Sequence, residues 1–174
     1  LQIEKGNTSY GYVAYYADNV INYNALLEYE YFTTEDGFKF MIFENTYYLI
    51  SYLGEEERPV IPLTVNGKSY TCTYMDATLR NIELSTDFTK INSRMFEDCI
   101  LLETITIPVS VTSIGYDAFY NCTSLKEIII PSSITSIGSS AFQNCTSLKE
   151  ITIPVSVTSI GSSAFYNCVS LETV

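Results

Sequence analysis

The chain has 174 residues, of which 47% are apolar, and its 9 basic and 20 acidic residues give a net charge of −11. This length suits one or two domains with a substantial core, and the negative charge disfavours nucleic acid and anionic membranes as direct partners. No run approaches the roughly 18 consecutive apolar residues of a membrane span. The absence of histidine removes Ser-His-Asp and Cys-His catalysis and most zinc chemistry, so we predict a non-catalytic chain without a cofactor.

Residues 1–36 are predicted to hold a degenerate repeat followed by a linker. The segment SYGYVAYY, 9–16, aligns with SIGYDAFY, 113–120, and places Gly11 over Gly115 and Ala14 over Ala118. Residues 21–36 show no such match. We expect them to be a linker with one helical turn.

Residues 37–59 are predicted to form a β-hairpin cap. The segment GFKFMIFENTYYLISYLG, 37–54, is dense in aromatic residues and partly alternates apolar with polar residues, with Glu44-Asn45 between two strand-like runs. The acidic segment GEEERP, 54–59, would join this hairpin to a repeat array. Terminal units of such an array must differ from internal ones, which favours a capping role.

From residue 82 to the end the sequence repeats every 23 residues without an insertion, and NCTSLKEI occurs at both 121–128 and 144–151. Single residue types recur at this step, for example Pro108, Pro131 and Pro154. The same step relates Phe96, Phe119, Phe142 and Phe165, and also Cys99, Cys122, Cys145 and Cys168. One such unit cannot bury its own apolar side, so we predict a solenoid of stacked units in which these two columns form a structural core ladder.

Within one unit, Ile128 and Ile130 alternate and are expected to face inward from a short strand, which Pro131 ends. Gly138 is expected to permit a turn, and Phe142 to fill the interior from a compact helical turn. The predicted fold is therefore mainly β with short helical or 3-10 turns and a parallel strand ladder. Residues 60–82 match the pattern in part and are predicted to be a degenerate first repeat of a solenoid over 60–174, without the Ala-Phe pair and the aligned cysteine.

The pattern L-x-x-I-x-I-P-x-x-V-x-S-I-G-x-x-A-F-x-N-C resembles the BspA-like subclass of leucine-rich repeats, which occur in many bacterial surface proteins. The resemblance covers residues 82–174. It implies a right-handed leucine-rich-repeat solenoid on a bacterial cell surface or secreted from the cell. It also implies adhesion to proteins or glycans of host matrix or of other microbes.

The cysteine column is predicted to consist of free, buried thiols. Stacked coils lie about 4.7–4.9 Å apart, which falls within the Cα separation of disulfides. Equivalent side chains of stacked coils nevertheless point in parallel, which disfavours the torsion that a disulfide needs. We expect these cysteines to act as small apolar residues.

The outward positions of the strands are predicted to form a concave contact face, flanked by Lys126 and Lys149. Ile129 is the apolar exception on this polar face. The near-identity of successive copies favours an alternative, a structural spacer within a larger surface protein; any catalytic part would lie outside this chain. The chain ends inside a further repeat, at Val174, which predicts a piece of a longer protein and self-association through an open C-terminal repeat edge. The predicted face comprises Thr104, Thr106, Glu127, Ile129, Glu150, Thr152 and Thr173.

Overall fold

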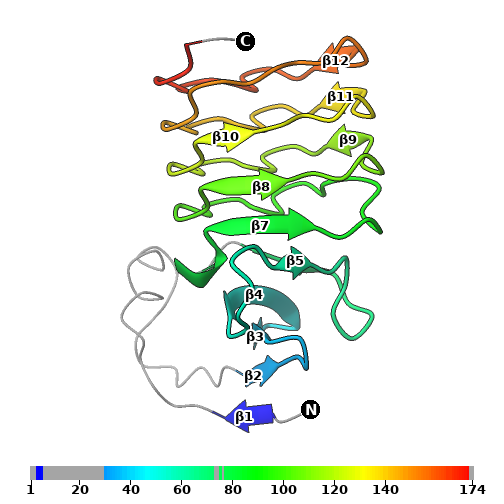
Figure 1. Cartoon of the computed structure of the whole chain (residues 1–174), viewed down its shortest axis with the longest axis vertical. Coiled ribbons are helices and arrows are strands. Elements are labelled where there is room, and N and C mark those ends of the chain that lie inside the picture. The colour runs from blue at the N-terminus through cyan, green and yellow to red at the C-terminus, as the bar shows by residue number, and fades with distance from the viewer. Residues whose placement is uncertain (1–2, 6–29, 73–74, 76, 173–174) are drawn as a thin grey trace.

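The computed structural model describes residues 3–5, 30–72, 75 and 77–172. In this part the chain forms a sheet at its N-terminal end and then a stack of about five coils along the long axis (Figure 1). The one 3-10 helix among the described residues is η2 (Ala77–Leu79). The predicted β-solenoid with a hairpin at its N-terminal end is confirmed.

The cap is a five-stranded sheet in the order β1-β2-β3-β4-β6. Neighbours from β1 to β4 are antiparallel, whereas β4 and β6 are parallel. Strands β3 and β4 are the predicted hairpin, and its two-residue turn has Glu44 and Asn45 at φ 47° and 61°. Positive φ at both positions is the geometry whose twist matches paired strands. The five strands are β1 (Ile3–Lys5), β2 (Glu30–Thr33), β3 (Phe38–Phe43), β4 (Thr46–Tyr52) and β6 (Tyr70–Thr71).

The described residues before the hairpin differ from the sequence-based expectation for 1–36. Ile3–Lys5 pairs antiparallel with Glu30–Thr33, and both strands belong to the cap sheet. The prediction of a linker is therefore wrong for residues 30–33. The repeat expected over 9–16 lies outside the described residues.

Aromatic packing joins the cap to the first coil. Phe40 is fully buried in β3, and its ring lies 5.2 Å from that of Phe32 and 5.1 Å from that of Tyr70. Tyr70 belongs to β6, inside the segment predicted to be the first repeat, and its hydroxyl donates to the carbonyl oxygen of Pro62. The hairpin thus covers the first coil with apolar side chains, as the terminal unit of a solenoid must.

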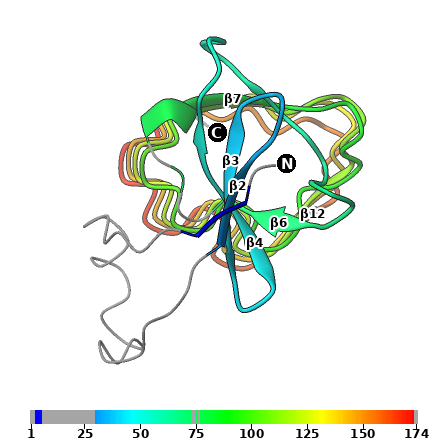
Figure 2. The same cartoon turned by 90° about the horizontal axis from the view of Figure 1, so that it is seen from below.

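Two parallel ladders hold the coils together. The first pairs four strands in the order β10-β8-β7-β5 and continues by a bridge from Glu127 to Glu150. The second pairs β12, β11 and β9 and is preceded by a bridge from Ile91 to Ile114. Seen along the axis, successive coils follow nearly the same outline (Figure 2). The strands are β5 (Val60–Ile61), β7 (Asn81–Leu84), β8 (Thr104–Thr106), β9 (Ser113–Ile114), β10 (Glu127–Ile128), β11 (Ser136–Ile137) and β12 (Ser159–Ile160).

Stacked phenylalanine rings run through the interior. The ring centroids of Phe96 and Phe119, and of Phe119 and Phe142, lie 5.2 Å apart with interplanar angles of 4°. Phe165 continues the stack at 5.4 Å and 2°. The first three rings are fully buried. Each ring therefore fills its own coil and contacts the equivalent ring in the next coil.

The cysteine column lies beside these rings, and its thiols are free. The Sγ atoms of Cys122, Cys145 and Cys168 donate to the carbonyl oxygens of Phe96, Phe119 and Phe142 at 3.1, 3.2 and 3.0 Å. Each thiol thus bonds to the preceding coil. Burial raises the pKa of the half-buried Cys168 thiol to about 11, so the proton that it donates is retained at neutral pH.

The first coil contains substitutes for both columns. The Cys72 amide donates to the Met95 carbonyl at 2.8 Å, as the Phe96 amide donates to the Ala118 carbonyl at 2.9 Å. The Met75 amide then donates to the Cys72 carbonyl as the Cys99 amide donates to the Phe96 carbonyl, in both cases at 3.2 Å. Cys72 and Met75 therefore occupy the phenylalanine and cysteine places, displaced by one residue from the 23-residue step. The first coil therefore keeps a buried apolar interior, which is built from Cys72 and Met75 in place of phenylalanine and cysteine.

The glycine column is required by the close approach of neighbouring coils. A Cβ atom on Gly138 would lie 2.5 Å from the carbonyl carbon of Gly115, and one on Gly115 would lie 2.5 Å from the Ser93 amide nitrogen. The left-handed residues of this coil are Ser140 and Asn144, at φ 53° and 63°. Gly138 is thus needed for packing between coils, and the turn conformation falls on polar residues that tolerate positive φ.

Truncating one interior ring should destabilise the whole stack. We expect Phe142→Ala to lower the free energy of unfolding by about 3–5 kcal/mol, because it removes buried surface and leaves a cavity between two rings. Ser132→Ala, an exposed change on the same coil, is the matched control. Urea unfolding followed by circular dichroism checks this, and equal midpoints for the two variants would contradict an energetic role for the ring stack.

The thiols should be protected in the native chain. Iodoacetamide at pH 8 should modify only Cys168, slowly, and the rate should rise as the pH approaches its pKa of about 11. The other four thiols should react once the chain is unfolded. Mass spectrometry of intact protein counts the adducts, and rapid native modification of Cys122 would show that the column is open.

Candidate functional site

Six predicted contact residues lie on the outward side of the first ladder, which we call the strand face: Thr104, Thr106, Glu127, Ile129, Glu150 and Thr152. They alternate with buried isoleucines such as Ile105 and Ile128. Thr104 is half-buried and the other five are exposed. Thr173, the seventh predicted residue, lies outside the described residues.

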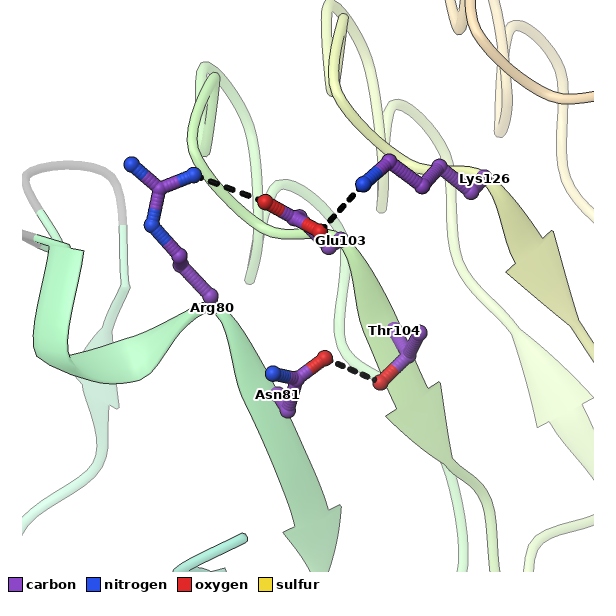
Figure 3. A network of polar contacts seen from close by, with 5 residues as sticks. All are labelled: Arg80, Asn81, Glu103, Thr104 and Lys126. Atoms are coloured by element: carbon purple, nitrogen blue, oxygen red, sulfur yellow. Dashed lines mark hydrogen bonds and ion pairs between the residues drawn. The ribbon is translucent and has the colours of Figure 1, made fainter. Parts of the chain in front are cut away.

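An ion-pair network runs across three coils beside this face (Figure 3). The Glu103 carboxylate accepts from Arg80 at 2.7 Å and from Lys126 at 2.5 Å, and the three residues are 23 apart. The hydrogen bond from Lys126, followed by that from Arg80, lowers the pKa of Glu103. Because Arg80 and Lys126 are largely exposed, the network contributes little stability and mainly holds its side chains in place. Lys126 was expected beside the strand face, but its column with Glu103 and Arg80 was missed, although the 23-residue step would have revealed it.

The two strand-face residues nearest the cap, Thr104 and Thr106, already make side-chain hydrogen bonds within the chain. The Thr104 hydroxyl donates to Asn81 Oδ1 at 2.8 Å (Figure 3), and Arg58, from the segment after the hairpin, donates to Thr106 Oγ1 at 3.4 Å. Among the described residues no side-chain hydrogen bond or ion pair involves Glu127, Glu150 or Thr152. The coils that carry Glu127 and Glu150, which we call the upper coils, therefore offer the polar groups that remain available to a partner.

Negative charge and one apolar side chain are concentrated on these upper coils. Glu127 and Glu150 are directly paired in the parallel ladder, so two exposed carboxylates occupy neighbouring coils. Like charges placed opposite each other on a sheet are unfavourable, and a cation from outside would relieve this repulsion. Ile129 lies nearby and is 72% exposed. The arrangement suits a partner that presents basic and apolar groups together.

The described residues contain no group of three or more His, Cys, Asp or Glu side chains that could hold a metal ion. Within the same ranges, no helix has the length and apolar character needed to cross a membrane.

The chain belongs to the family of BspA-type leucine-rich repeat regions, whose model matches residues 68–174 in six copies. This confirms the resemblance seen in the repeat pattern and extends it to the first coil. No curated protein matches the chain significantly.

Two solved structures are similar over most of the chain. A leucine-rich repeat protein of T. pallidum shares 28% identity with a TM-score of 0.57, over 82% of this chain and 66% of that one. A leucine-rich repeat protein of Bacteroides ovatus shares 29% identity with a TM-score of 0.55, over 68% of this chain and 30% of that one. The chain thus spans just under two thirds of the first protein and under a third of the second.

The Glu103 network should stabilise the chain only when the carboxyl is ionised. Its lowered pKa means that the stabilisation is present above the ordinary value of 4.5 and is lost as the pH falls through the lower folded value. We expect Glu103→Gln to lower the unfolding midpoint slightly at pH 7, because the ion pairs are largely exposed, and this small difference to vanish in acid. Glu127→Gln, which breaks no ion pair among the described residues, should not lower it at either pH. A loss for Glu103→Gln that is independent of pH would contradict this assignment.

Proposed function

We propose that the chain is a non-catalytic interaction module on a bacterial cell surface, or secreted from the cell, which binds partners through the strand face. The observation that carries the proposal is Ile129, an isoleucine 72% exposed on an otherwise polar face. Exposed apolar groups surrounded by polar residues are typical of binding surfaces. The family, with its repeat architecture, supports a role in protein binding.

The charges favour a partner of defined chemistry. Glu127 and Glu150 would meet basic side chains, while Ile129 would fill an apolar hollow in the partner. The sequence-based expectation of host-matrix or microbial proteins or glycans remains the proposed range of partners. Within the described part of the strand face, Glu127, Glu150 and Thr152 keep free polar groups, so we place the contact on their coils and not at Thr104 and Thr106.

A structural spacer is the second candidate function. The phenylalanine stack repeats at 5.2, 5.2 and 5.4 Å with nearly parallel rings, so the coils form a regular rod segment. The neighbouring copies also repeat Lys126-Glu127 as Lys149-Glu150. A spacer would tolerate replacement of every residue of the strand face.

A binding screen with a matched pair of variants separates these functions. The immobilised chain is offered a panel of extracellular-matrix and plasma proteins and glycans at physiological salt. Saturable binding should weaken roughly a hundredfold in Ile129→Glu, which places a charge in the contact. Val109→Glu changes another exposed aliphatic residue, 78% exposed and off the strand face, and should leave binding intact.

Two outcomes would overturn the binding proposal. The first is the absence of saturable binding across the panel, both for this chain and for a longer array. The second is equal loss in Ile129→Glu and Val109→Glu, which would indicate non-specific adsorption.

A further inference from the structure

A column of polar and aromatic side chains lies away from the strand face. It follows the turns that lead from a strand of the second ladder to the next strand of the first ladder. Glu97, Tyr120, Gln143 and Tyr166 are each 23 residues apart, and we call them the tyrosine column. Backbone bonds confirm that they stack coil on coil: the amides of Asp98, Asn121 and Asn144 donate to the carbonyls of Tyr120, Gln143 and Tyr166 at 2.9, 2.8 and 2.9 Å. This column therefore rises by one coil at each residue.

From Tyr120 to Tyr166 the residue type changes at each coil of this column, whereas the two neighbouring columns keep one residue type over the same three coils. The preceding column is phenylalanine at all four coils, and the following one is Asp98, Asn121, Asn144 and Asn167. Tyr166 is 65% exposed and Tyr120 is half-buried, and among the described residues neither hydroxyl makes a hydrogen bond. Glu97 is positioned by Arg94 at 3.8 Å. Two aromatic platforms thus alternate with an acid and an amide, residue types that stack on sugar rings and hydrogen-bond to their hydroxyls.

The distance between the two tyrosines along the solenoid axis favours one kind of extended ligand over another. The rings of Phe119, Phe142 and Phe165, which immediately precede the column residues, are 5.2 and 5.4 Å apart. Tyr120 and Tyr166, two coils apart, are therefore separated by about 10 Å along the axis, which is twice the strand spacing. In a β-1,4-linked hexose chain every second ring presents the same face, and this repeat is close to two coil steps. Same-face side chains of an extended peptide recur at only about 7 Å, which does not match.

We propose that the tyrosine column binds a β-1,4-linked glycan chain lying along the solenoid axis. Tyr120 and Tyr166 stack on alternate sugar rings. Gln143 hydrogen-bonds to hydroxyls of the ring between them, and Glu97 to those of the ring on the other side of Tyr120. This site uses different turns from the strand face and does not depend on the function proposed for that face.

Titration calorimetry with defined oligosaccharides tests the proposal. Cellohexaose or chitohexaose should bind saturably, whereas maltohexaose, whose α-1,4 linkages curve the chain, should not. Tyr120→Ala and Tyr166→Ala should each weaken binding roughly tenfold or more. Val155→Ala shortens another exposed side chain, which lies outside the column, and should leave affinity unchanged. Thermal unfolding of each variant confirms that the fold is retained.

A variant that changes the distance between the two tyrosines distinguishes binding that depends on their spacing from non-specific adsorption to tyrosine. Exchanging two residues, as Gln143→Tyr with Tyr166→Gln, keeps the composition of the column but brings its rings onto neighbouring coils. The β-1,4 probes should then bind roughly tenfold more weakly, because adjacent sugar rings present opposite faces. The proposal is overturned if neither β-1,4 probe binds, if maltohexaose binds equally well, or if the exchange leaves affinity unchanged.

Discussion

Each coil of this protein can bury its apolar side only against its neighbours, and this constraint shapes the chain from Phe32 to Phe165. It explains why one phenylalanine per coil stacks face to face and why β3 and β4 cover the first coil with aromatic side chains. It also explains why thiols donate to carbonyls of the preceding coil. Contacts between coils are close enough that glycine is the residue that fits at positions 115 and 138.

The same constraint makes inward and outward positions of the repeat vary differently from coil to coil. Inward columns repeat with little change because every coil meets the same neighbour. Outward columns are free of that requirement, so changes along them are informative. Ile129 interrupts the polar strand face, and tyrosine alternates with glutamine at positions 120, 143 and 166. Both proposed binding surfaces come from such departures.

Periodicity made most of the solenoid predictable, and the misses share a cause. The phenylalanine and cysteine columns and the outward positions follow from a strict 23-residue step. Cys72 and Met75 escaped notice because they are displaced by one residue from it, although their hydrogen bonds match those of later coils. Strand β2 was missed because the antiparallel cap has no period. The contact of Arg58 with Thr106 joins residues 48 apart and has no local signal in the sequence.

The glycine column has a consequence for how such a chain changes over generations. Since a Cβ atom at Gly138 would meet the backbone of the preceding coil, an insertion that shifts the register of that coil places a larger residue in the glycine position. Unequal exchange between two copies of the gene segment adds or removes complete units and restores every stacked contact. Length therefore becomes a trait that can vary in whole steps, while the fold and the cap stay the same.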